Sequence, residues 1–202
     1  MDGTLTNSAT LLANSINYVR AKLNLEPLEQ SIVIEQINNP NCDMAKFFYN
    51  LNTIEPIHEE WFKEYYSANH NVELELYSGV VDMLKDLKNS GIYLAVATNA
   101  YRDSTLEALT HLEILDIFDD IICFDDVQEP KPSPDMLYVL QKSFGLSSKE
   151  IVFVGDSQRD ELAAKEARIE FIKVAFGSNL VGVINNPQDV TRKMEEYFCI
   201  IN

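Results

Sequence analysis

The chain has few of the residues that mark disulfide-linked, metal-ligating and membrane-spanning proteins. Its 202 residues include only 3 cysteines and 3 histidines. The cysteines, Cys42, Cys123 and Cys199, are odd in number and lack the spacing of a metal site, which indicates a reduced protein without disulfides. No apolar run approaches the roughly 20 residues that cross a bilayer, and no basic-then-apolar signal segment opens the chain. We therefore expect a cytoplasmic protein with no membrane partner.

Positive charge is also scarce. The chain has 16 Lys and Arg residues against 32 Asp and Glu residues, a formal net charge of -16 at pH 7. Nucleic acids need a basic protein face to offset their phosphates, so this balance excludes a nucleic-acid partner. The acidic surface also repels anionic small molecules, so a phosphorylated ligand would need a local positive centre. With 46% apolar residues, the chain can build one large domain or two small ones.

The pattern of the chain changes near Tyr77. From Ser8 to about His70, apolar residues recur at helical spacing, prolines separate the segments, and no strand pattern is present. From Ser78 onward, short apolar runs alternate with amphipathic segments. In the first region the spacing predicts a helix that begins after Ser8 and further helices over 44–51 and 58–70. In the second it predicts strands over 92–97, 121–124, 151–154 and 171–174, and helices over 79–88, 104–112, 134–144 and 161–167.

Alternating strands and helices predict an α/β fold in which helices wrap a parallel, Rossmann-like sheet. The segment 92–97 is apolar throughout, as expected for a strand that is buried on both faces of such a sheet. The helix-only region would then be an insertion into this core. We predict an α/β core of residues 1–8 and 78–202 and an all-helical cap of residues 9–77.

Four short polar motifs lie after or near the predicted strands. They are Asp2-Gly3-Thr4, Thr98-Asn99, Lys131 between two prolines, and Gly155-Asp156-Ser157, with Asp160 four residues beyond Asp156. In an open parallel sheet, ligands collect beyond the carboxyl ends of the strands. We therefore expect Asp2, Thr98, Lys131 and Asp156 to converge on one site. A fixed positive charge, hydrogen-bond donors and hard oxygen ligands for Mg²⁺ are what phosphoryl transfer requires.

In this order, the motifs resemble those of the haloacid dehalogenase superfamily, in particular its phosphoglycolate phosphatases and β-phosphoglucomutases. The resemblance runs from Asp2 to Asp160 and implies the same α/β core with an inserted helical cap. The family's first loop reads Asp-x-Asp-Gly-Thr, and its first Asp attacks phosphorus. Met1 stands at the x position, so we expect the attacking Asp immediately upstream of Met1.

The resemblance also implies catalytic and substrate-binding roles. Asp2 would act as general acid toward the leaving alcohol and then as general base toward the water that attacks the aspartyl-phosphate. Lys131 would place its charge against the transferring phosphoryl group, with a second role in substrate binding. Thr98 and the backbone near Asn99 would bind phosphate oxygens. The expected reaction is the hydrolysis of a small phosphorylated metabolite.

The same resemblance implies a Mg²⁺ site. Asp156 and the backbone carbonyl of Asp2 would ligate the ion, and Asp160 would sit near it, through water or a neighbouring group. The metal would offset the carboxylates that otherwise repel an anionic substrate.

Each of these residues has a plainer structural explanation. Asp2 could cap a turn, and Thr98 could simply end a strand. Asp156 could be the N-cap of the next helix, with Asp160 one turn later. Lys131 could be a solvated loop residue, although the flanking prolines stiffen its backbone. These explanations do not account for the occurrence of all four motifs in this order.

Three other functions share parts of the pattern. A sugar-phosphate mutase of the same family uses the same core, and only the acceptor differs; we prefer the phosphatase because hydrolysis is the commoner outcome in the family. A signalling receiver domain also gathers Asp, Thr, Lys and Mg²⁺, but it is shorter and has no helical insertion. A non-catalytic phosphate-binding relative without its nucleophile is the third alternative. No feature of the sequence indicates the substrate's identity or the oligomeric state.

Overall fold

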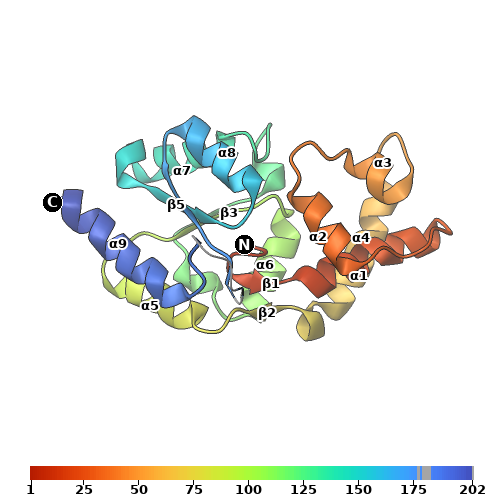
Figure 1. Ribbon diagram of the computed structural model, residues 1–202, viewed down its shortest axis with the longest axis horizontal. Coiled ribbons are helices and arrows are strands. Elements are labelled where there is room, and N and C mark those ends of the chain that lie inside the picture. The colour runs from red at the N-terminus through yellow and green to blue at the C-terminus, as the bar shows by residue number, and fades with distance from the viewer. Residues whose placement is uncertain (177, 179–182, 202) are drawn as a thin grey trace. The chain divides into compact units, whose positions relative to one another are not determined.

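The computed structural model of the protein describes residues 1–176, 178 and 183–201 and divides into two compact units (Figure 1). One unit contains Met1–Thr6 and Leu76–Asn202, and the other is Asn7–Glu75. The chain passes between them twice, at two short strands that pair with each other, β1 (Thr6–Asn7) and β2 (Glu75–Leu76). The predicted boundaries lie two residues further along the chain at each crossing, and the role of the helical unit as a cap stays a prediction.

Strands alternate with helices in the first unit. The strands are β3 (Ala95–Ala97), β4 (Asp120–Ile122), β5 (Val152–Gly155) and β6 (Glu170–Lys173). The α-helices are α5 (Val80–Asn89), α6 (Arg102–His111), α7 (Asp135–Phe144), α8 (Gln158–Ala167) and α9 (Pro187–Ile201). Among the described residues, no helix combines the length and the apolarity that a membrane span requires.

The strands of the first unit form parallel pairs. β3 pairs with β4, with Ala95 opposite Asp120, and β5 pairs with β6, with Val152 opposite Glu170. In the described part of the chain the two pairs are separate ladders, because β3 and β5 do not pair with each other. The predicted α/β fold class, a Rossmann-like core with a helical insertion, is confirmed, although the described core strands do not form one continuous sheet.

Helices α7 and α8 lie together over the strands (Figure 1). Their buried apolar residues form one cluster with the ends of β3 and β4: Ala97, Ile122, Met136, Leu137, Leu140, Ala163, Ala164 and Ala167. On α5, the apolar residues at helical spacing, Val80, Met83, Leu84 and Leu87, are buried. Each large side chain buried in this way stabilises the fold by about 1.5–3 kcal/mol. The helical periodicity of the sequence therefore accounts for the inward faces of these helices.

The second unit consists of α1 (Ala9–Lys22), α2 (Gln30–Asn38), α3 (Met44–Tyr49) and α4 (Pro56–Glu73). Its core gathers residues from α1, α2 and α3: Ala13, Ile16, Val19, Val33, Phe48 and Tyr49. The buried guanidinium of Arg20 donates to the carbonyls of Glu26, at 2.8 Å, and of Phe48, which ties two later segments to α1. Residues 8–74, all of them described, contain no strand.

Two strands are shorter than predicted because side chains take their hydrogen bonds. β3 begins at Ala95 rather than at residue 92, and the N–H of Leu94 donates to the Asp119 carboxylate at 2.8 Å. β4 ends at Ile122 rather than at residue 124. There the N–H of Cys123 donates to the Asp126 carboxylate at 2.7 Å, and the chain turns.

The predictions were wrong for the start of α8 and missed α9, whereas α1 begins after Ser8 as predicted. α8 begins at Gln158, three residues early, because the Ser157 hydroxyl accepts from the Asp160 N–H; the alternative in which Asp156 is the N-cap is therefore wrong. Ser8 stands at the N-cap position of α1, but its side chain forms no capping hydrogen bond. α9 was not predicted, although its Pro187 start and the buried Val190 and Met194 one turn apart were visible signals.

Candidate active site

A cluster of polar residues lies at the carboxyl ends of β3 and β5. Thr98 directly follows β3, and Asp156 directly follows β5. Lys131 lies in the loop that precedes α7. Its Nζ donates to the carbonyl of Ala97, the last residue of β3, at 2.8 Å and to the Asp160 carboxylate of α8 at 2.6 Å. Lys131 thus connects the end of β3 to the helix that follows β5.

Lys131 and Asp160 form a buried ion pair, with relative exposures of 7% and 5%. The second carboxylate oxygen of Asp160 accepts from the N–H of Ser157 at 3.1 Å and from its hydroxyl at 2.6 Å. Burial alone would raise the pKa of Asp160, but the charge and hydrogen bond of Lys131, with smaller contributions from the Met1 amino group and Ser157, lower it to about 2. Asp160 is therefore an anion at neutral pH, and it fixes the ammonium group of Lys131.

The side chain of Asn99 fixes the backbone of Lys131. Its Nδ2 donates to the Lys131 carbonyl at 2.7 Å, and its Oδ1 accepts from the Lys131 N–H at 3.0 Å. Both ends of the amide are used, so Asn99 holds the Lys131 loop beside the end of β3. Pro130 and Pro132 restrict the same stretch of backbone.

The first loop of the chain lies directly against Asp156. Thr4 Oγ1 donates to Asp156 Oδ1 at 2.6 Å. Gly3 has a φ of +73°, and a β-carbon there would lie 2.3 Å from Asp156 Oδ2, so only glycine fits. A similar approach occurs at Gly155, where a β-carbon would lie 2.6 Å from the β-carbon of Asp160. The two glycines make room for the two carboxylates.

Asp156 and Asp160 differ in how their charges are compensated. Burial raises the pKa of Asp156, and the neighbouring charge of Asp160 adds to this, while Thr4, the Met1 amino group and Lys131 act in the opposite direction. The net shift is upward, so the anion of Asp156 is destabilised. A carboxylate of this kind gains free energy from an additional cation or hydrogen-bond donor.

The first two residues complete the cluster. Burial lowers the pKa of the Met1 amino group, Lys131 lowers it further, and the charges of Asp2, Asp160 and Asp156 raise it. All four charged side chains therefore lie around Met1. The structure brings these four predicted site residues together.

Two threonines lie at the edge of the cluster. Thr98 is buried, its N–H donates to the Ile122 carbonyl at 3.0 Å, and its Oγ1 accepts from the Ala100 N–H at 3.2 Å. This leaves the hydroxyl hydrogen of Thr98 to donate to another group. Thr6 Oγ1 donates a long hydrogen bond of 3.4 Å to the Asp2 carboxylate. The predicted substrate-binding roles of Thr98 and Asn99 stay predictions, and the observed partner of the Asn99 side chain is Lys131.

The acidic residues of the cluster are the candidate ligands for Mg²⁺. Within the described residues, no three His, Cys, Asp or Glu side chains are grouped so that they could hold a metal ion by themselves. The charges nevertheless fit a divalent cation, because three carboxylates of the cluster, Asp2, Asp156 and Asp160, outnumber its one charged lysine side chain, Lys131. Both carboxylate oxygens of Asp160 are already engaged, so Asp156 and Asp2 are the residues with oxygens to offer.

Two residues of the cluster were missed in the sequence interpretation. Ser157 joins α8 to Asp160, and the spacing Ser157-x-x-Asp160 matches a capping-box pattern that was a usable signal. Thr4 holds Asp156, but a threonine after a Gly turn gives no such signal by itself.

The haloacid dehalogenase-like hydrolase family model matches residues 1–174. The chain belongs to this family. The matched range includes both glycine–aspartate contacts and the Lys131–Asp160 pair. The family membership inferred from the sequence motifs is confirmed.

Two curated relatives of this haloacid dehalogenase-like protein match along most of their own length. The pyrophosphatase PpaX of Halalkalibacterium halodurans is 27% identical, and the alignment covers 100% of this chain and 94% of the relative. The phosphoglycolate phosphatase of Pasteurella multocida is 32% identical, with 89% of this chain and 84% of the relative covered.

Two solved structures have a similar fold. A predicted phosphoglycolate phosphatase from Haemophilus somnus 129pt is 30% identical and superposes with a TM-score of 0.83, covering 96% of this chain and 95% of the other. A candidate β-phosphoglucomutase from Thermotoga maritima, 20% identical, has a TM-score of 0.74 and covers 97% and 96% of the two chains. At that identity the second match shows the fold alone.

Gly3→Ala should destabilise the protein more than Gly145→Ala. Both residues have positive φ, +73° and +66°, so each alanine carries the left-handed strain of about 1–2 kcal/mol. At Gly145 nothing lies within 4 Å of the added methyl group, whereas at Gly3 it meets the carboxylate of Asp156. We expect the Gly3 variant to lose about 1–3 kcal/mol more in urea denaturation. Equal losses would contradict the close approach of Gly3 to Asp156.

Asp160→Asn and Asp156→Asn should change stability in opposite directions. Asp160→Asn leaves the Lys131 ammonium buried without its counter-charge, at a cost of about 3–5 kcal/mol. Asp156→Asn removes an anion whose raised pKa shows it to be destabilised, so the free energy of unfolding should stay the same or increase. Urea denaturation at pH 7 without added Mg²⁺ measures both effects. If the two variants were equally destabilised, either the lowered pKa of Asp160 or the raised pKa of Asp156 would be wrong.

The Asp160 effect should also depend on pH. Because the pKa of Asp160 is about 2 in the folded chain and about 3.9 in an unfolded one, its stabilisation is complete above the unfolded value. It is lost as the pH falls through that window toward the folded value. The stability difference between the wild type and Asp160→Asn should therefore shrink as the pH is lowered from about 5 to 2. A difference that is constant over this range would argue against the charged pair.

Proposed function

We propose that this protein is a Mg²⁺-dependent phosphatase that hydrolyses a small phosphorylated metabolite through an aspartyl-phosphate intermediate. The observation that carries the proposal is the buried ammonium of Lys131, which Asp160 holds near the Asp156 carboxylate, a group whose pKa is raised by burial. The family membership and the phosphatase relatives at about one-third identity support it.

Lys131 supplies the fixed positive charge of the proposed site. Its ammonium is held by the carboxylate of Asp160 and the carbonyl of Ala97, and its backbone by Asn99. A charge that needs no reorganisation during the reaction stabilises the developing charge on a transferring phosphoryl group best. The hydroxyl hydrogen of Thr98 is a donor for a phosphate oxygen at the same strand end.

Asp2 carries the proton in the proposed mechanism. Protonated, it gives a proton to the leaving oxygen of the substrate; as an anion, it then takes a proton from the attacking water. The nucleophile belongs to the position directly before Met1, which the family's first-loop pattern assigns to Asp. This carboxylate would form a bond to phosphorus as the ester oxygen leaves, and water would then break that bond.

Asp156 and the backbone carbonyl of Asp2 would hold the Mg²⁺ ion. When bound, Mg²⁺ would neutralise charge on the phosphoryl oxygens and offset the surrounding carboxylates. The destabilised anion of Asp156 is the structural reason for this assignment. Asp160 would act on the same site through Lys131.

The relatives suggest two classes of substrate. One named relative is a phosphoglycolate phosphatase and the other a pyrophosphatase, so we propose a small phosphate monoester or pyrophosphate as the substrate. The β-phosphoglucomutase match, at 20% identity, shows the fold alone and does not favour a mutase over a phosphatase.

Activity should require the upstream carboxylate, Asp2 and Lys131. The 202-residue chain should hydrolyse p-nitrophenyl phosphate and phosphoglycolate slowly with Mg²⁺, and a chain extended before Met1 by an apolar segment ending in Asp should hydrolyse at least one of them rapidly. In the extended chain, Asp2→Asn should reduce kcat by about 10²–10⁴-fold. Lys131→Met should reduce it by about 10²-fold or more, whereas Lys142→Ala, an exposed lysine of α7, should not change it.

Two outcomes would contradict this account. Ordinary enzymatic rates from the 202-residue chain would mean that another carboxylate is the nucleophile. Full activity of the extended chain in EDTA would show that the reaction does not need a metal. Denaturation curves of each variant separate a loss of catalysis from a loss of folding.

A further inference from the structure

The ammonium group of Lys131 also contacts an aromatic ring. Its Nζ lies over the ring of Phe153, 5.4 Å from the centroid. The face of a phenyl ring carries a partial negative charge and attracts a cation within about 6 Å of its centre. Because Lys131 is buried, water screens this attraction little. Phe153 is therefore the third group, after Asp160 and the Ala97 carbonyl, that stabilises the ammonium.

Phe153 reaches Lys131 from the middle of β5. Alternate residues of a strand point to the same face of its sheet, so Phe153 and Gly155 share a face. At Gly155, a β-carbon would lie 2.6 Å from the β-carbon of Asp160. This face of β5 thus meets both members of the ion pair. Phe153 supplies a ring to the ammonium, and Gly155 leaves room for the carboxylate.

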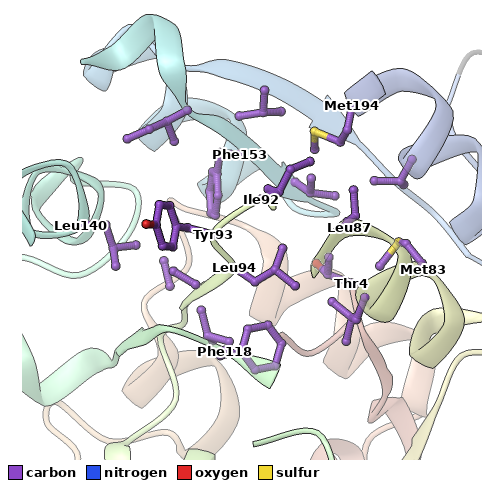
Figure 2. A pocket seen from close by; sticks show the side chains of 18 of the residues that line it. Thr4, Met83, Leu87, Ile92, Tyr93, Leu94, Phe118, Leu140, Phe153 and Met194 are labelled. Atoms are coloured by element: carbon purple, nitrogen blue, oxygen red, sulfur yellow. The ribbon is translucent and has the colours of Figure 1, made fainter. Parts of the chain in front are cut away.

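Packing holds the ring of Phe153 in place. Phe153 is partly buried and packs against the apolar cluster of α7 and α8, which includes Leu140 (Figure 2). Phe171 of β6 is its partner in the parallel register, and the two rings lie 6.2 Å apart at an angle of 49°. Phe171 packs against the same cluster, but within the described residues the ring beside the Lys131 ammonium is that of Phe153. The two neighbouring phenyl rings therefore differ in their contact with the charge.

One N–H of Lys131 has no hydrogen-bond acceptor in the part of the chain that the structure describes. A lysine ammonium has three N–H donors. The Ala97 carbonyl and Asp160 Oδ1 accept two of them, at 2.8 Å and 2.6 Å. The lysine side chain is a flexible four-carbon stem, so two hydrogen bonds alone leave the ammonium some freedom to move. A fixed ring on one side limits that movement while the third N–H stays available.

We propose that Phe153 is a positioning residue for Lys131. Its ring holds the ammonium beside Asp160 and the Ala97 carbonyl, so that the remaining N–H is available to an anion. The effect on catalysis rests on the proposed function, in which Lys131 places its charge against the transferring phosphoryl group. The position of the ammonium does not rest on that function, and it can be measured without a substrate.

Nuclear magnetic resonance measures the position of the ammonium in the 202-residue chain. Protons over the face of a phenyl ring are shifted upfield by its ring current. We therefore expect the ε-methylene protons of Lys131 upfield of those of Lys142, an exposed lysine of α7. Phe153→Leu should remove this shift, and Phe153→Tyr, which keeps a ring, should retain it. The matched control, Phe171→Leu, removes the same volume from the same cluster and should also retain it.

A double-mutant cycle measures the interaction between the ring and the ammonium. Urea denaturation gives the unfolding equilibrium constants of the wild type, Phe153→Leu, Lys131→Met and the double variant. For a buried ammonium over a ring, we expect a coupling of about tenfold or more in this constant. The same cycle with Phe171→Leu should give a coupling below about twofold. If Lys131→Met does not fold, the resonance measurement still decides, because it leaves Lys131 in place.

Kinetics of the extended chain with p-nitrophenyl phosphate measure the consequence for catalysis. Phe153→Leu should lower kcat about tenfold, and Phe153→Tyr should recover most of that loss. Phe171→Leu should leave kcat within about twofold of the wild type. In the Lys131→Met background, Phe153→Leu should have no further effect, because Phe153 acts through the ammonium.

The outcomes separate this inference from the proposed function. If Phe153→Leu and Phe171→Leu give the same Lys131 shift and the same coupling to Lys131→Met, Phe153 does not position the ammonium, whatever the activity. If the shift and the coupling are present but Phe153→Leu keeps its full kcat in an active chain, the contact is structural and the positioning role is wrong. If the extended chain is inactive, or is active without Lys131, the proposed function is wrong, and the shift and the coupling still support or exclude the contact.

Discussion

The buried ion pair of Lys131 and Asp160 is the interaction on which the candidate site depends. It connects the end of β3 to the start of α8, the helix that follows β5. In the part of the chain that the structure describes, the β3–β4 pair and the β5–β6 pair do not hydrogen-bond to each other. A buried pair contributes little net stability unless its remaining hydrogen-bonding positions are filled. Here the Ala97 carbonyl and Ser157 fill them. The pair thus fixes a positive charge at a strand end in a chain whose net charge is -16.

Asp156 and Asp160 have pKa values shifted in opposite directions, because Lys131 forms its ion pair with Asp160. The Asp160 carboxylate pairs with Lys131 and accepts hydrogen bonds from Ser157 at the start of α8, and its pKa is low. Asp156 receives mainly the Thr4 hydroxyl, and burial keeps its pKa high. Gly3 and Gly155 allow backbone to approach both groups closely. The site therefore combines a cation that is paired with Asp160 and a second carboxylate, Asp156, that is only partly compensated, which suits a ligand that brings both a metal ion and a phosphate group.

The fold class and the cluster could be predicted from the sequence because both depend on local patterns. Apolar periodicity predicts the helices. Because the residues that follow parallel strands lie at one edge of the sheet, the sequence also predicts that Asp2, Lys131 and Asp156 lie close together. The partner of Asn99 could not be predicted, because it depends on a loop 32 residues away. The short β3 depends in the same way on the Asp119 side chain.

A crystal structure of the protein with Mg²⁺ and vanadate, a mimic of the transferring phosphoryl group, tests the central claim most directly. The account predicts a metal about 2.0–2.1 Å from an Asp156 carboxylate oxygen. It also predicts a vanadate oxygen within about 3 Å of Lys131 Nζ, with the Lys131–Asp160 pair intact. Metal and vanadate bound elsewhere on the chain, or a Lys131 side chain turned away from the anion, would contradict it.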